Sequence, residues 1–479
     1  MQDESASAFL LFPNFMQKLD KRRGKMNCQT AAARLKWEHR KICFPPILKL
    51  QEESEIMTAA AYQAAFVRVA PRVPGVLYIP AVPGEKSRLG VIAMHCEADY
   101  LDHSIGPGLA KRGYTVLCAN THDDADSAAS KIRDVGAAMR FLRALPGIEK
   151  VVVMGHSGGA TLMSAYQSVA EHGPAVFQGP EKLIPLPAEG MDGLIPADGF
   201  LGLDSNWGNG AMRLFGTDPA ILDEQSGVKI DPALDAFSPA NGWTPEGAHY
   251  SDKFLARWFA GQRARNERLI AHALDRLAVL NAGKGYYLDD EPMIVPAAVL
   301  FGPNNKLFPQ DVRLLSRTAE PQKLIHNGGT VTTEVVHTLR RPRHLQSCAP
   351  YLFRGAMHTS VKKFLDSWAV RTEEGYHYDD RRTYGIDFHS AYTCTPGNIA
   401  HVTVPTLILG MNASWEFSAV ETIFQNSGAA DKQCGFIEGA DHDFYTDHAA
   451  ERFPGEFGDT TETTYDYVDK WLSAPGRFF

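Results

Sequence analysis

The stretch that decides the fold is Val151-Val152-Val153-Met154-Gly155-His156-Ser157-Gly158-Gly159. Its first four residues form a short apolar run that is typical of a buried strand, and residues 160–166 show a helical pattern. Strand, G-x-S-x-G and helix in this order predict a sharp turn that exposes the side chain of Ser157. Small residues at both ends of the pentapeptide let the backbone pass closely there. The N–H of Gly158 is then expected to point to the place where an oxyanion would form.

Strands and helices alternate along the chain on both sides of this turn. We expect strands at 65–69, 76–80, 89–94, 114–119, 151–154, 198–204, 404–410 and 434–438, and helices at 104–111, 127–145, 160–166, 418–425 and 461–472. This alternation predicts an α/β fold with a mostly parallel, twisted sheet and helices on both faces. Ligands bind at the carboxyl ends of the strands in such sheets, where His95–Tyr100, Asn120–Asp126 and Ser157 all fall.

The alternation is interrupted for nearly two hundred residues in the second half of the chain. The interrupted region carries several tryptophans and a helical apolar stripe over about 252–281. At 479 residues the chain also exceeds the ~250–300 residues at which a single core stops growing. We therefore expect four parts: an N-terminal extension (1–57), the first part of the core (58–206), a large inserted cap (207–400) and the second part of the core (401–479).

Composition narrows the classes of function. The chain is 44% hydrophobic and 22% charged, as in ordinary globular proteins, and its net charge of −8 argues against a broad nucleic-acid-binding surface. No apolar run reaches ~18 residues, and the N-terminus lacks the pattern of a signal peptide, so neither membrane association nor export is expected. Seven scattered cysteines without C-x-x-C spacing predict reduced thiols and a cytoplasmic location.

With the turn at Ser157, a late strand and the segment Glu438-Gly439-Ala440-Asp441-His442, the chain resembles the α/β-hydrolase superfamily. The resemblance covers roughly 60–206 and 400–475, and favours the serine-nucleophile branch with a large cap between the sixth and seventh core strands. It implies a catalytic triad in the chain order serine, acid, histidine. Ser157 would be the nucleophile and His442, in a polar loop after the last strand, the base.

Two carboxylates compete for the role of the acid. Glu416 follows the seventh strand in Asn412-Ala413-Ser414-Trp415-Glu416 and is the preferred assignment. Asp204, at the end of the sixth strand, occupies an alternative acid position of the superfamily. Asp441 and Asp443 flank the histidine too closely in sequence to fold back easily onto its ring.

The oxyanion hole is expected to combine the N–H of Gly158 with a second N–H from Cys96 or Glu97. The segment Met94-His95-Cys96-Glu97 occupies the place of the superfamily's oxyanion loop but departs from its common His-Gly-Gly form. The identity of the second donor therefore stays open.

The resemblance implies a serine hydrolase that cleaves an acyl bond, such as a carboxylic ester, lactone or amide. The cap and its tryptophans, with Trp415 beside the preferred acid, suggest a moderately sized, apolar small molecule as substrate. Tyr100 and Trp415 are candidate substrate-binding residues, although a structural role explains each of them equally well. The alternatives are an acyltransferase and a non-catalytic binding protein with the same fold. A histidine base must be neutral, so activity should rise through a pKa near ~6.5.

Neither a metal nor another cofactor is expected. His95, Glu97, Asp99, Asp102 and His103 lie close together in sequence, as do four residues between 122 and 126, but neither group has a recognised ligand spacing. No glycine-rich phosphate loop is present. The expected partner is a small-molecule substrate, with no nucleic acid and no membrane, and homo-oligomerisation stays open.

Overall fold

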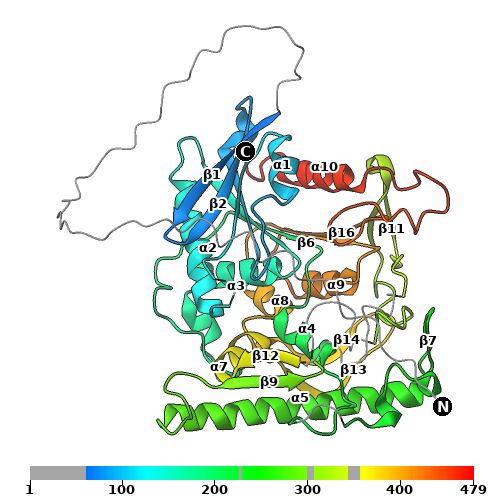
Figure 1. Ribbon diagram of the computed structural model, residues 1–479. Coiled ribbons are helices and arrows are strands. Elements are labelled where there is room, and N and C mark those ends of the chain that lie inside the picture. Colours follow the sequence, from blue (N-terminus) through cyan, green and yellow to red (C-terminus); the bar gives the residue numbers. More distant parts are fainter. Residues whose placement is uncertain (1–60, 124, 226–228, 299–306, 343–355) are drawn as a thin grey trace, which may run out of the picture. The chain divides into compact units, whose positions relative to one another are not determined.

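The computed structural model describes residues 61–123, 125–225, 229–298, 307–342 and 356–479 (Figure 1). The predicted N-terminal extension, 1–57, lies outside the described residues. No helix among the described residues is both long and apolar enough to cross a membrane.

One sheet of ten strands organises the described chain, in the order β1-β2-β4-β3-β5-β6-β15-β16-β10-β11. The strands are β1 (Tyr62–Ala70), β2 (Val73–Pro80), β3 (Leu89–Met94), β4 (Thr115–Ala119), β5 (Lys150–His156), β6 (Gly199–Leu203), β10 (Gln322–Ile325), β11 (Val331–Glu334), β15 (Thr406–Met411) and β16 (Lys432–Ile437). All neighbours from β4 to β10 run parallel, while β1, β2 and β11 pair antiparallel. The predicted fold class is confirmed.

Helices cover both faces of this sheet (Figure 1). They are α1 (Ile105–Ala110), α2 (Ala128–Arg143), α3 (Gly159–His172), α9 (Phe417–Asn426) and α10 (Thr460–Leu472). Successive residues of a strand point to opposite faces, so Val151 and Val153 join the apolar cluster under α2, α3 and α9. Val152 and Met154 join the cluster under α1 and α10. Burial on both faces explains why the sequence before Ser157 is apolar without alternation.

The residues between β6 and β15 form a large insertion. It contains the helices α4 (Asn209–Gly216), α5 (Asp252–Asn281), α7 (Val361–Lys363), η6 (Phe364–Trp368) and α8 (Thr395–Asn398). It also holds three strand pairs, β7 (Trp243–Thr244) with β8 (Gly247–Ala248), β9 (Pro292–Pro296) with β12 (Ala356–Ser360), and β13 (Arg371–Tyr378) with β14 (Thr383–Asp387). The long helix that the apolar stripe predicts is α5, and Ile270 and Ala273 of that stripe are buried against β9 and β12.

Part of this insertion belongs to the sheet. Strands β10 and β11, which fall within the predicted cap region 207–400, extend the sheet beyond β16. Leu324 and Ile325 of β10 pair with Phe436 and Ile437 of β16. Both added strands have four residues, and all four residues of β11 are exposed, so neither carries a strong strand pattern in the sequence.

Candidate active site

The turn at Ser157 has the strained geometry that its sequence predicts. Ser157 has a φ of +55°, in the left-handed region that non-glycine residues rarely occupy. A Cβ on Gly155 would lie 2.2 Å from the Cα of Ala160, and a Cβ on Gly159 would lie 2.5 Å from the carbonyl oxygen of Met94. Because both contacts are with backbone atoms, only glycine fits at these two positions. The tight turn places Ser157 between the end of β5 and the start of α3.

His442 lies in the loop after β16, and its ring is held by Asp204. Nδ1 of His442 is 2.5 Å from Oδ2 of Asp204, whose side chain is fully buried. A carboxylate only accepts, so Nδ1 carries the proton and Nε2 is left to act as a base. The carboxylate also accepts hydrogen bonds from the N–H of Met411 (3.0 Å) and the hydroxyl of Ser414 (2.5 Å).

The acid preferred from the sequence, Glu416, is not the carboxylate bonded to Nδ1 of His442; that position belongs to the alternative, Asp204. Asp204 directly follows β6 with a φ of +40°, and its N–H donates to the carbonyl of Leu409 in β15. This turn brings its side chain to the strand end next to His442. Glu416 instead lies at the start of α9, where Oε1 accepts a hydrogen bond from Nε1 of Trp415 (2.8 Å).

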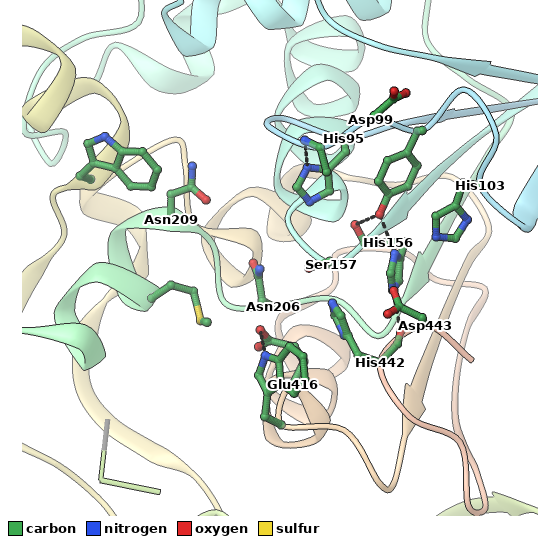
Figure 2. A pocket seen from close by; sticks show the side chains of 15 residues that line it. His95, Asp99, His103, His156, Ser157, Asn206, Asn209, Glu416, His442 and Asp443 are labelled. Carbon is green, nitrogen blue, oxygen red and sulfur yellow. Dashed lines mark hydrogen bonds between the residues drawn. The ribbon is translucent and has the colours of Figure 1, made fainter. Parts of the chain in front are cut away.

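Ser157 and His442 line one cavity of about 360 Å³ (Figure 2). The core supplies most of its wall, and the insertion adds Asn209 and Met212 of α4 and Trp368 of η6. The predicted site residues did not include several residues of this wall, among them Asn206, Asn209, Met212, Trp368 and Asp443. The position of Asn206 and Asn209 just after β6, at the carboxyl edge of the sheet, is the signal that could have found them.

Four histidines line this cavity, and their pKa values differ in direction. Burial lowers the pKa of His95 to about 3 and that of His103 to about 4, and lowers the pKa of His156 well below its ordinary value. Burial also lowers the pKa of His442, but the hydrogen bond and charge of Asp204 outweigh it, so that pKa is raised above 6.5. Of these four, only His442 is therefore placed to exchange a proton near neutral pH.

His156, which precedes Ser157, is bonded to the backbone of His442. Its Nε2 is 2.8 Å from the main-chain oxygen of His442, which only accepts, so Nε2 carries the proton. Its Nδ1 therefore accepts from the hydroxyl of Tyr100, at 2.6 Å. Tyr100, a candidate substrate-binding residue, lines the cavity, but its hydroxyl orients His156.

One group of three among the described residues has ligand atoms close enough to hold a metal ion: His103, His156 and Asp443, within 4.8 Å of one another. Both ring nitrogens of His156 are already in the hydrogen bonds with Tyr100 and the His442 backbone. A metal would have to displace one of them, so this group fits a metal poorly.

The candidate oxyanion donors differ in what they contact. Gly158, which carries the first expected donor, directly precedes α3. Burial raises the pKa of the Cys96 thiol to about 12, and this neutral thiol donates to the carbonyl of Gly158 at 3.5 Å. The N–H of Glu97, one of the two predicted second donors, instead donates to Nδ1 of His95 at 2.9 Å. It therefore does not point at an oxyanion.

The sheet order, the strained serine after β5 and the histidine after β16 define an α/β-hydrolase fold, as the sequence resemblance implied. No family model and no curated protein sequence matches the chain. Similar solved structures include Est1E from Butyrivibrio proteoclasticus, with 10% identity over 86% of this chain and 99% of that chain and a TM-score of 0.36. The siderophore hydrolase EstB from Aspergillus fumigatus has 11% identity over 87% and 99%, with a TM-score of 0.39. A dienelactone hydrolase from Anabaena variabilis has 9% identity over 86% and 97%, with a TM-score of 0.33.

Proposed function

We propose that this protein is a serine hydrolase that cleaves an acyl bond of a small molecule. Ser157 is the nucleophile, His442 the general base and Asp204 the acid that orients the base. The observation that carries the proposal is the 2.5 Å contact between Asp204 and Nδ1 of His442. His442 lines the same cavity as Ser157, whose backbone is strained. That contact fixes the tautomer that serine activation requires.

The reaction proceeds in two halves that use the same base. Oγ of Ser157 attacks the carbonyl carbon while its proton passes to Nε2 of His442, and the carbonyl π electrons move onto the oxygen. The N–H of Gly158 stabilises this oxyanion. The oxyanion collapses to an acyl-enzyme as the leaving group takes the proton from His442. Water then attacks the acyl-enzyme with the same histidine as base. This step releases the carboxylic acid product and restores Ser157.

The cavity wall indicates a compact, uncharged substrate. About 360 Å³ lies near the lower end of the range for small-molecule sites, ~300–1,000 Å³. Trp415, Trp368 and Met212 give it apolar surface. Carboxylates also line it, from Asp99, Glu416 and Asp443. An apolar ester or lactone without a negative charge fits this lining best.

We expect a neutral ester to be a better substrate than an anionic one of similar size. At an effective dielectric constant of about 20, a like charge at roughly 10 Å costs about 1–2 kcal/mol. Thus p-nitrophenyl butyrate should exceed p-nitrophenyl hemisuccinate in kcat/KM by about tenfold or more at low salt. The ratio should shrink as salt is added and in Glu416→Gln. Equal rates for the two esters would contradict this reading of the cavity.

Activity should require the neutral form of His442. Because Asp204 raises the pKa of His442, kcat/KM for p-nitrophenyl butyrate should rise with pH through a midpoint above 6.5. Below that midpoint it should fall about tenfold per pH unit, as one proton blocks the base. The other three cavity histidines stay neutral, so a single limb is expected between about pH 5 and 8. A flat profile, or a midpoint below 6.5, would argue against His442 as the base.

Labelling with a fluorophosphonate probe tests the proposed function directly. One probe per chain should be found by intact-mass measurement of the wild-type protein, and none on Ser157→Ala. Hydrolysis of p-nitrophenyl butyrate in the presence of an added alcohol then separates hydrolysis from acyl transfer, by the products formed. Absence of labelling on a well-folded wild-type protein would overturn the proposal and favour a non-catalytic binding protein.

A further inference from the structure

We propose that the side chain of His95 is itself a donor of the oxyanion hole, through its Nε2–H, beside the main-chain N–H of Gly158. This inference rests on the proposed function and names a catalytic group within it. It adds a donor beside Gly158 in place of the N–H of Glu97, which is committed elsewhere, while the N–H of Cys96 remains the other predicted candidate.

The hydrogen bonds of His95 fix which nitrogen carries its proton. Nδ1 accepts from two main-chain N–H groups, those of Glu97 and Ala98, each at 2.9 Å. Backbone N–H groups only donate, so Nδ1 has no proton and the neutral ring carries its proton on Nε2. Burial holds the pKa of this ring at about 3, so it stays neutral wherever His442 is active.

Nε2 of His95 lies beside the turn that carries Ser157. Nε2 lies 3.0 Å from the place that a Cβ on Gly158 would occupy. His95 lines the same cavity as Ser157 and His442, and Figure 2 shows all three around it. The residue is only 8% exposed, and within the described ranges no hydrogen-bond partner of Nε2 is seen. His95 lines the cavity, and a donor there without a protein partner can hydrogen-bond to a group that arrives with the substrate.

The ring is also held in a fixed orientation. It stacks on Tyr100, with ring centroids 5.1 Å apart and an angle of 17° between the planes. Tyr100 stacks in turn on His103, at 4.5 Å and 10°. The two backbone donors at Nδ1 add a second constraint. A donor fixed in this way loses little free energy to reorganisation when charge develops on the carbonyl oxygen.

The chemistry needs no additional reactant. As Ser157 attacks, the carbonyl π electrons move to the oxygen, and its negative charge accepts hydrogen bonds from the Gly158 N–H and the His95 Nε2–H. The His95 proton stays on Nε2 throughout, because His442 carries out the proton transfers. The two backbone N–H groups at Nδ1 polarise the ring and strengthen its Nε2–H as a donor. The N–H of Glu97 thus contributes to the oxyanion hole through His95.

Two substitutions separate this role from a purely structural one. In His95→Asn, the side-chain oxygen takes the place of Nδ1 and still accepts from the loop, but no donor remains at the place of Nε2. In His95→Gln, the side-chain amide reaches the place of Nε2 as a donor, while the acceptor for the loop is lost. We expect kcat for p-nitrophenyl butyrate to fall about 10²–10³-fold in His95→Asn with KM little changed, and less than about tenfold in His95→Gln. A structural role predicts the opposite order.

A third measurement needs no variant. A boronic acid such as n-butylboronic acid forms a tetrahedral anion on an activated serine. In the complex, the Nε2–H proton of His95 should move downfield in a spectrum of the histidine-labelled wild-type protein. An unchanged resonance, or wild-type kcat in folded His95→Asn, would overturn the role of His95 while leaving Ser157 labelled by fluorophosphonate. Failure of that labelling in the wild-type protein would instead overturn the proposed function.

Discussion

Replacing Asp204 by asparagine is expected to lower kcat for p-nitrophenyl butyrate by about 10³–10⁴-fold. The amide of asparagine donates to Nδ1 of His442, so the single proton of the neutral ring moves to Nε2. A protonated Nε2 cannot accept the proton of Ser157. The variant should also have a lower midpoint of the pH profile, because the hydrogen bond and charge of Asp204 raise the pKa of His442 in the wild-type protein.

Glu416→Gln is the matched control for this prediction. Like Asp204→Asn, Glu416→Gln removes a buried carboxylate that raises the pKa of His442. The carboxylate of Glu416, however, is not the one bonded to Nδ1. Its kcat should stay within about tenfold of the wild-type value, because the tautomer of His442 is unchanged. A large loss in Glu416→Gln together with a small loss in Asp204→Asn would restore Glu416 as the acid. Fluorophosphonate labelling rates give a second, substrate-independent comparison of the two variants.

Replacing Gly155 by alanine is expected to destabilise the protein by about 3 kcal/mol or more. The added Cβ would lie 2.2 Å from the Cα and 2.4 Å from the nitrogen of Ala160. These are backbone atoms at the start of α3, so no change of rotamer relieves the overlap, and β5 and α3 must move apart. Urea unfolding followed by circular dichroism measures the loss.

Gly84→Ala is the control for the Gly155 substitution. Gly84 has a φ of −146°, which any residue adopts, and a Cβ there would meet no atom within 4 Å. Its free energy of unfolding should stay within about 0.5 kcal/mol of the wild-type value. Equal stabilities for both variants would show that the turn at Ser157 tolerates a side chain at position 155.

Much of the core could be predicted because its signals are local. The apolar run before Ser157, the small residues around it and the stripe of α5 each lie within a short stretch of sequence. Strands β10 and β11 could not be found in this way. Four residues are too few to show a period, and what makes them strands is the free edge of β16, a feature of the folded sheet.

Only those site residues that a local sequence motif or strand position marks could be predicted from the sequence. Ser157 stands in its motif and His442 follows the last core strand, so both could be named as candidates from the sequence, and both line one cavity in the structure. The choice between Asp204 and Glu416 depends on a backbone angle at the end of β6, which residue types alone do not reveal. The part that we propose for His95 depends on two hydrogen bonds to its own loop, which appear only once that loop is folded.

The hydrogen bond from His156 to the backbone of His442 has a mechanical consequence. The two residues are 286 positions apart in the chain; His156 precedes the proposed nucleophile, and His442 is the proposed base. This hydrogen bond links the strand end that carries Ser157 to the loop that carries His442. We therefore expect the two segments to move together, which would hold Ser157 and His442 in one cavity while other parts of the core move.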